Sequence, residues 1–166
     1  MNADIIKRLI MFVVLSLAQV LILNHIHLFE VATPLLYVYF TLTFRRHTPK
    51  WIVLTWSFAL GLVVDVFSNT PGLAAGSLTL IAMIQPYLLE LLTPRDSAED
   101  MEASAATLGI AKFSLLCLAL VTLYCLVFFA LEAFSFFNWL SWMERALASA
   151  ALTLVLISAI ESVRSR

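Results

Sequence analysis

Residues 61–76 of this chain read Gly61-Leu62-Val63-Val64-Asp65-Val66-Phe67-Ser68-Asn69-Thr70-Pro71-Gly72-Leu73-Ala74-Ala75-Gly76. They follow an apolar run that starts at Trp51 and ends at Phe67, close to the minimum of about 17 residues for a membrane-spanning helix. Asp65 lies inside that run, where an ionisable group costs about 2.5–3.5 kcal/mol on insertion scales. Such residues are usually paired and face the interior of a bundle, so this stretch predicts a membrane helix with a specialised position at Asp65.

The composition of the chain restricts it to the membrane class. The 166 residues are 62% hydrophobic and 13% charged, and the mean hydropathy is +0.97, whereas soluble domains are about half apolar and about one quarter charged. The net charge of −1 argues against a nucleic-acid partner, because phosphate binding needs a concentrated basic face. We therefore expect a single transmembrane domain over residues 1–166, surrounded by membrane lipid.

Six hydrophobic segments predict an all-α, polytopic, six-helix transmembrane bundle. The approximate spans are 9–23, 28–44, 51–67, 73–92, 108–130 and 146–160. The first and last are short unless flanking residues such as Leu140–Met143 extend them. Pro34 lies near the start of the second, and a half-span there would leave five crossings. The N-terminal segment is interpreted as a retained span, with cleavage as a signal peptide the less favoured alternative.

The distribution of cations predicts the orientation. Cytoplasmic flanks of membrane spans collect Lys and Arg. With six spans and the N-terminus inside, the inner side holds nine of the ten cations: Lys7, Arg8, Arg45, Arg46, Lys50, Arg95, Lys112, Arg164 and Arg166. The outer side holds Arg145 alone. We therefore expect an even number of crossings and both termini in the cytoplasm.

Small residues mark faces on which helices can approach closely. Ser57, Gly61 and Asp65 are spaced by four residues and share one helical stripe. Gly72 and Gly76 form a G-x-x-x-G pattern at the start of the next span, the spacing that allows close helix packing in lipid. Packing within the bundle is the simplest interpretation, and contact with a partner helix is the alternative for some of these positions.

Two further sets of residues are structural or interaction candidates. Gln85 lies beside Pro86 in the fourth span, where the amide needs an interior partner and the proline is expected to kink the helix. Trp139 and Trp142 belong to an aromatic outer segment that also contains Phe134, Phe136 and Phe137. Such rings anchor at the headgroup level, and an interfacial helix or a hydrophobic docking surface are the alternatives.

No motif predicts catalysis, a metal or a cofactor. His25, His27 and Glu30 are of ligand type, but their spacing is poor for zinc. Glycine-rich phosphate loops and a Ser or Cys nucleophile with a plausible base are missing from the sequence. Cys117 and Cys125 lie about 12 Å apart on one helix, too far for a disulfide, so we expect buried thiols and a non-enzymatic protein.

The stretch 61–76 resembles the rod shape-determining protein MreD family of bacterial inner-membrane proteins. The matching residues are Gly61, Asp65, Ser68, Pro71 and Gly72; the Leu that is common between the Pro and the Gly in the family is missing here. Chain length, span number and the basic inner loop from Arg45 to His47 also agree with the family.

This resemblance implies a non-catalytic component of the cell-elongation machinery. Such a component binds the single-span periplasmic scaffold MreC, and connects to the actin-like MreB filament and to the RodA-type glycosyltransferase with its transpeptidase. The family is similar in fold to the vitamin-binding components of energy-coupling-factor transporters, which supplies a small-molecule binding module as the rival function. Those components often carry an Ala-x-x-x-Ala face on the first span; here the nearest analogue is Ala146 with Ala150, in the last span. A proton-coupled transporter using Asp65 or Glu90 is a third possibility.

The predicted orientation places Asp65 near the outer surface, about 21 Å along the third span from Trp51. The N-terminus of the next helix, at Gly72–Gly76, should return beside it. A helix N-terminus presents unpaired N–H groups and a partial positive charge, which suit a carboxylate. We therefore expect Asp65 to pin this outer hairpin by accepting hydrogen bonds from Ser68, Asn69 or the backbone near Gly72.

Overall fold

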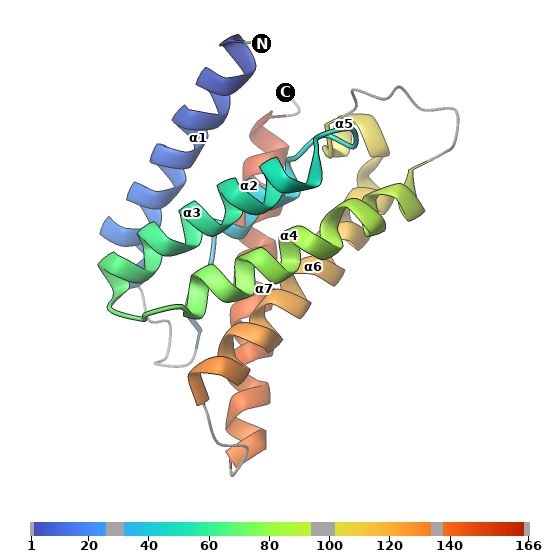
Figure 1. Ribbon diagram of the computed structural model, residues 1–166. Helices are drawn as coiled ribbons and strands as arrows, with labels where there is room; N and C mark the ends of the chain where they lie inside the picture. Colours follow the sequence, from blue (N-terminus) through green and yellow to red (C-terminus); the bar gives the residue numbers. More distant parts are fainter. Residues whose placement is uncertain (1, 26–31, 94–101, 134–137, 165–166) are drawn as a thin grey trace.

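The computed structural model describes residues 2–25, 32–93, 102–133 and 138–164 (Figure 1). These residues form an all-helical protein with five long helices: α1 (Asn2–Leu21), α3 (Lys50–Ser68), α4 (Leu73–Leu92), α6 (Ile110–Ala133) and α7 (Trp139–Arg164). The short elements are a 3-10 helix, η1 (Leu23–His25), and two short helices, α2 (Val38–Leu42) and α5 (Ala105–Leu108). An isolated antiparallel bridge joins Arg45 to Glu102.

Four helices are long and apolar enough to cross a membrane, namely α3, α4, α6 and α7. They correspond to the predicted spans 51–67, 73–92, 108–130 and 146–160, with α6 beginning two residues later than predicted and α7 extended through Leu140–Met143. α1 covers most of the predicted first span and has 20 residues, but its first two turns carry Asp4, Lys7 and Arg8. The described part of the chain therefore contains four candidate spans rather than six.

The predicted second span, 28–44, is not a continuous helix in the structure. Residues 28–31 lie outside the described part, and from Ala32 onward the chain is extended or turning, apart from the five residues of α2. All five of those residues are buried, and α2 contacts α1, α3, α4 and α6. The segment is apolar because protein surrounds it on every side, and Pro34, which has no N–H, disfavours a helix at its start.

Side chains of the long helices satisfy the backbone of this segment, called the inner strap (residues 32–44) from here on. Five hydrogen bonds do so: Thr33 N–H to Ser149 Oγ at 3.1 Å, Leu35 N–H to Thr153 Oγ1 at 3.1 Å, Leu36 N–H to Gln19 Oε1 at 3.1 Å, Gln19 Nε2 to the Pro34 carbonyl at 2.9 Å and Gln85 Nε2 to the Phe44 carbonyl at 3.4 Å. Irregular backbone at membrane depth is tolerated where protein buries it and binds its polar groups. The polar residues inside the helices therefore support the inner strap.

The long helices pack as two antiparallel pairs with α1 along one side (Figure 1). α3 and α4 form the most extensive helix–helix contact, α6 pairs with α7, and α4 joins the two pairs by packing on α6. The N-terminus of α1 and the C-terminus of α7 lie at the same end of the molecule in Figure 1. The turn between α3 and α4 lies at the side of the molecule, beside the end of α1, and the end of α6 and the start of α7 lie farthest from the termini in this view.

Candidate functional site

Asp65 joins α3 to the first turn of α4. Its side chain is 3% exposed. Oδ1 accepts hydrogen bonds from the Ala74 N–H at 2.8 Å and the Thr70 hydroxyl at 3.0 Å, and Oδ2 accepts one from the Ala75 N–H at 2.9 Å. The first N–H groups of a helix have no intrahelical partner, so this carboxylate caps α4 from a neighbouring helix. Hydrogen bonds to a carboxylate are shorter and stronger than neutral ones.

The turn between the helices brings these groups together. Asn69 ends α3 in the left-handed conformation (φ 55°), and the N–H groups of Asn69 and Thr70 both donate to the Asp65 carbonyl. Gly72 precedes α4 with a φ of 83°, a conformation that glycine adopts without steric cost. The expected backbone donors near Gly72 are present, at Ala74 and Ala75. The side-chain donor is Thr70, which the sequence reasoning missed.

Gly61 allows α3 and α4 to approach closely. A Cβ atom on Gly61 would lie 2.4 Å from the Ala75 Cα and 2.8 Å from the Ala74 carbonyl oxygen, so no larger residue fits without moving a backbone. Ser57, one turn earlier on the same stripe, is fully buried and shares a hydrogen bond with Thr41 of the inner strap. The predicted stripe is therefore the inner face of α3.

The G-x-x-x-G pattern of Gly72 and Gly76 was predicted to allow close helix packing, but neither glycine lies at a close helix contact. Gly72 serves the turn, where a Cβ would meet nothing within 4 Å. Gly76 is exposed, and its nearest neighbour would be a Leu131 side-chain carbon at 4.0 Å, an ordinary contact. Close packing uses Gly61 instead, because α4 presents the backbone of Ala74 and Ala75 to α3. Ser68 is half-buried at the end of α3, and Pro71 is exposed in the turn.

The remaining predicted residues lie outside the hairpin turn. Gln85 is 1% exposed and faces the bundle interior, where it binds the Phe44 carbonyl, and α4 continues through Pro86. Trp139 is 59% exposed at the start of α7, while Trp142 is half-buried with its indole N–H unbonded among the described residues. Phe134, Phe136 and Phe137 lie outside the described residues. Cys117 and Cys125 are free and buried.

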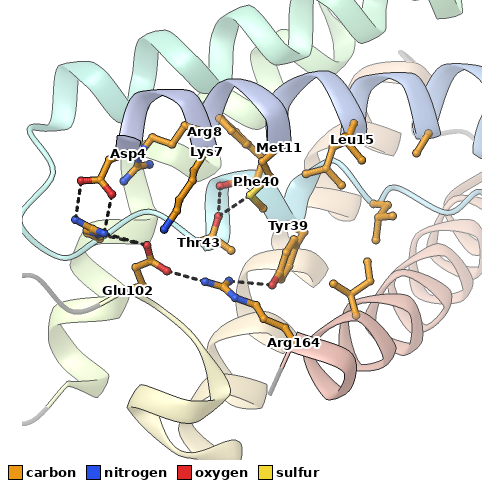
Figure 2. Close-up of a pocket in the computed structure, with 15 residues that line it drawn as sticks. Asp4, Lys7, Arg8, Met11, Leu15, Tyr39, Phe40, Thr43, Glu102 and Arg164 are labelled. Carbon is orange, nitrogen blue, oxygen red and sulfur yellow. Dashed lines mark hydrogen bonds and ion pairs between the residues drawn. The ribbon is translucent and has the colours of Figure 1, made fainter. Parts of the chain in front are cut away.

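A second cluster, which the sequence did not predict, joins four distant segments at the end of the molecule that holds the termini (Figure 2). Arg45 binds Asp4 of α1 through Nη2 at 3.1 Å, and it also binds Glu102 at 3.3 Å. Arg164 of α7 binds the other oxygen of Glu102 at 2.6 Å. We call these four residues the terminal cluster. The start of α1, the loop after the inner strap, the segment before α5 and the end of α7 therefore lie together.

Glu161 anchors the same region from inside the protein. Its side chain is 5% exposed. One oxygen accepts a hydrogen bond from the Tyr39 hydroxyl at 2.8 Å, and the other accepts one from the Ala105 N–H, at the start of α5, at 2.7 Å. Arg164 donates to the Tyr39 oxygen at 3.3 Å, which links Glu161 to the terminal cluster. In the sequence, the feature that could have pointed to this role is the position of Glu161, a glutamate near the end of an apolar run.

A cavity of about 350 Å³ lies beside the α3–α4 turn, away from the terminal cluster; it is called the outer cavity from here on, after the side on which the predicted orientation would place it. Its lining includes Gln19, His25, Thr33, Tyr37, Thr70 and Glu132. The Tyr37 hydroxyl forms a hydrogen bond with that of Tyr124 in the core. His27 and Glu30 lie outside the described residues, and within the described ranges no three His, Cys, Asp or Glu residues gather as a metal site would require.

Asp65 joins α3 to α4, and the terminal cluster joins four segments of the described chain. Comparisons of the chain with models of protein families, with curated proteins and with solved structures find no match in any of the three.

Proposed function

We propose that this protein is a non-catalytic membrane scaffold of the bacterial cell-elongation complex, located in the cytoplasmic membrane. It binds an MreC-like single-span protein, and through that partner it supports lateral peptidoglycan synthesis by a RodA-type glycosyltransferase, its transpeptidase and an MreB filament. The observation that carries the proposal is the binding of Asp65 to the N-terminus of α4. It gives Gly61, Asp65 and Gly72, three of the five residues behind the MreD resemblance, a common structural role.

A scaffold benefits from a surface that is ordered before its partner arrives, because ordering on binding reduces affinity. The three hydrogen bonds of Asp65 and the contact at Gly61 hold the α3–α4 hairpin in one arrangement. Asn69, Pro71 and Gly72 are exposed at its tip. In the proposed orientation this tip faces the periplasm, where an MreC-like protein would contact it.

We place both termini in the cytoplasm, with six passes of which the second is the inner strap. Near its start the strap binds α1 close to that helix's end, through the Leu36 N–H and Gln19, and it leads to Arg45, which binds Asp4 at the start of α1. It therefore returns the chain to the side from which α1 departs. Lys7, Arg8, Arg45 and Arg164 gather at that side, as expected for a cytoplasmic face.

Depletion of the protein in its host tests this proposal. We expect cells to lose their rod shape while vitamin uptake continues at the normal rate. Re-expression of the chain should restore the rod shape. If depleted cells stay rod-shaped, or if they lose vitamin uptake instead, the proposed elongation role is wrong.

A vitamin-binding component of an energy-coupling-factor type transporter is the second candidate, and the outer cavity is the observation that favours it. Its volume of about 350 Å³ falls within the range of roughly 300–1,000 Å³ that small-molecule sites occupy. This function predicts that the purified protein retains a vitamin, and that vitamin starvation induces its expression. Mass spectrometry of the purified protein distinguishes the two functions.

A further inference from the structure

A cavity of about 440 Å³ lies between α1 and the inner strap, and it extends to α7 (Figure 2). One end is charged and includes the terminal cluster. The other end is apolar, with Val14, Leu15, Ala18, Leu36 and Ile160 in its lining. Val14 is 56% exposed, so the cavity is open beside α1 on the surface that would face lipid.

The charged end has an excess of positive charge. Among the described residues, four cations and two carboxylates line the cavity, and the carboxylates, Asp4 and Glu102, are already paired with Arg45 and Arg164. Lys7 and Arg8 are the surplus cations. Arg8 lies over the Phe44 ring, 4.4 Å from its centroid. The Lys7 amine reaches into the cavity in Figure 2 and has no hydrogen-bond or ion-pair partner among the described residues.

The length of the cavity matches a lipid better than a small ion. Lining residues on α1 extend from Asp4 to Ala18, which corresponds to about 21 Å along a helix. The hydrocarbon of one leaflet is about 15 Å deep, half of the bilayer core. The cavity therefore passes from headgroup level into acyl-chain depth, whereas a free phosphate would fill only the charged end.

We infer that this cavity is a binding site for one anionic phospholipid of the leaflet on the side of the termini. The phosphodiester contacts Lys7 and Arg8, and an acyl chain lies along Val14 and Ala18 beside α1. Basic pockets between membrane helices bind anionic head groups in this way. The lipid fills the space between α1 and the strap, and this assignment does not depend on the elongation role.

Native mass spectrometry of the full chain in neutral detergent tests the site. Phosphatidylglycerol and phosphatidylcholine with identical acyl chains are titrated separately, and we expect one phosphatidylglycerol to bind preferentially. Lys7→Gln should weaken phosphatidylglycerol binding about fivefold, the effect of one surface cation on an anionic lipid. Lys112→Gln is the matched control, because Lys112 is exposed at the start of α6 and does not line the cavity.

Variants at the apolar end of the cavity distinguish a bound phospholipid from bound free phosphate. Ala18→Trp fills that end and should reduce phosphatidylglycerol binding, whereas Leu17→Trp, on the exposed neighbouring face, should leave binding unchanged. Inorganic phosphate should not displace the lipid. The inference is overturned if the Lys7 and Lys112 variants behave alike, if phosphatidylcholine binds equally well, or if inorganic phosphate displaces the lipid while Ala18→Trp has no effect.

Discussion

The Oδ2 atom of Asp65 accepts a hydrogen bond from the Ala75 N–H at 2.9 Å, so the end of α3 is bound to the first turn of α4. One turn earlier, the missing side chain of Gly61 lets the same Ala75 approach, since a Cβ there would lie 2.4 Å from the Ala75 Cα. Hydrogen bonding and close packing therefore act on a single residue of α4, and together they hold the hairpin closed.

Asp65→Asn should destabilise the protein by about 2 kcal/mol, the typical contribution of a hydrogen bond to a charged group. Asparagine keeps one acceptor oxygen but places an NH₂ group opposite a backbone N–H, so one donor of α4 loses its partner. Equilibrium unfolding in mixed SDS micelles measures the loss. Glu90→Gln, at an exposed carboxylate of α4, should change stability by less than about 0.5 kcal/mol. Equal stability of the two variants would show that Asp65 does not hold the hairpin.

Gly61→Ala should destabilise the protein by roughly 1–3 kcal/mol, as overpacking does, because the new methyl group would overlap the Ala74 and Ala75 backbone. Gly76→Ala is the matched control. Its Cβ would meet only a Leu131 side-chain carbon at 4.0 Å, and replacing a glycine inside a helix is neutral or stabilising. The same unfolding assay applies. If both variants lose the same stability, α3 and α4 do not meet at Gly61.

Thr153→Val should destabilise the protein by about 1–3 kcal/mol, the penalty for a buried donor left without a partner. Thr153 Oγ1 accepts the Leu35 N–H of the inner strap and donates to the Ser149 carbonyl. Thr79→Val is the control, because the Thr79 hydroxyl donates only to the Ala75 carbonyl of its own helix. Hydrogen exchange should also rise at Leu35 in the first variant alone. Unchanged hydrogen exchange at Leu35 would contradict the hydrogen bond between Thr153 and the inner strap.

The terminal cluster predicts that both ends of the described chain lie on one side of the membrane. Single cysteines at Ala3 and Val163, both exposed, should react with a membrane-impermeant maleimide in inverted vesicles and stay unlabelled in intact cells. A cysteine at Asn69 should show the opposite pattern. Labelling of Ala3 and Val163 from opposite sides would exclude six passes and the ion pairs that join Asp4 to Arg164 through Arg45 and Glu102.

The sequence was sufficient to predict helices whose apolar runs end at clear breakers. Pro49 precedes α3, and Pro71 with Gly72 separates α3 from α4. The role of Asp65 also followed from local information, because its donors lie within ten residues of it. Thr70 was missed as a donor because the left-handed conformation of Asn69, which turns the chain at this point, is not evident from residue type alone.

The inner strap could not be predicted in the same way. An apolar run buried on all sides has the composition of a membrane helix, and only Pro34 distinguishes it. An extended chain rises about 3.3 Å per residue, against 1.5 Å for a helix, so residues 32–44 can cross the bundle without a full-length helix. The terminal cluster could not be predicted from the sequence either, because its residues come from four separate parts of the chain: Asp4, Arg45, Glu102 and Arg164.

Capture of an MreC-like single-span protein tests the central claim most directly. The tagged full chain is produced in membranes together with that partner and purified in mild detergent. The scaffold role predicts that the partner co-purifies with wild type and Glu90→Gln, and that Asp65→Asn retains less of it because the hairpin is no longer held. A wild-type chain that purifies without the partner, or that carries a bound vitamin instead, would contradict the account.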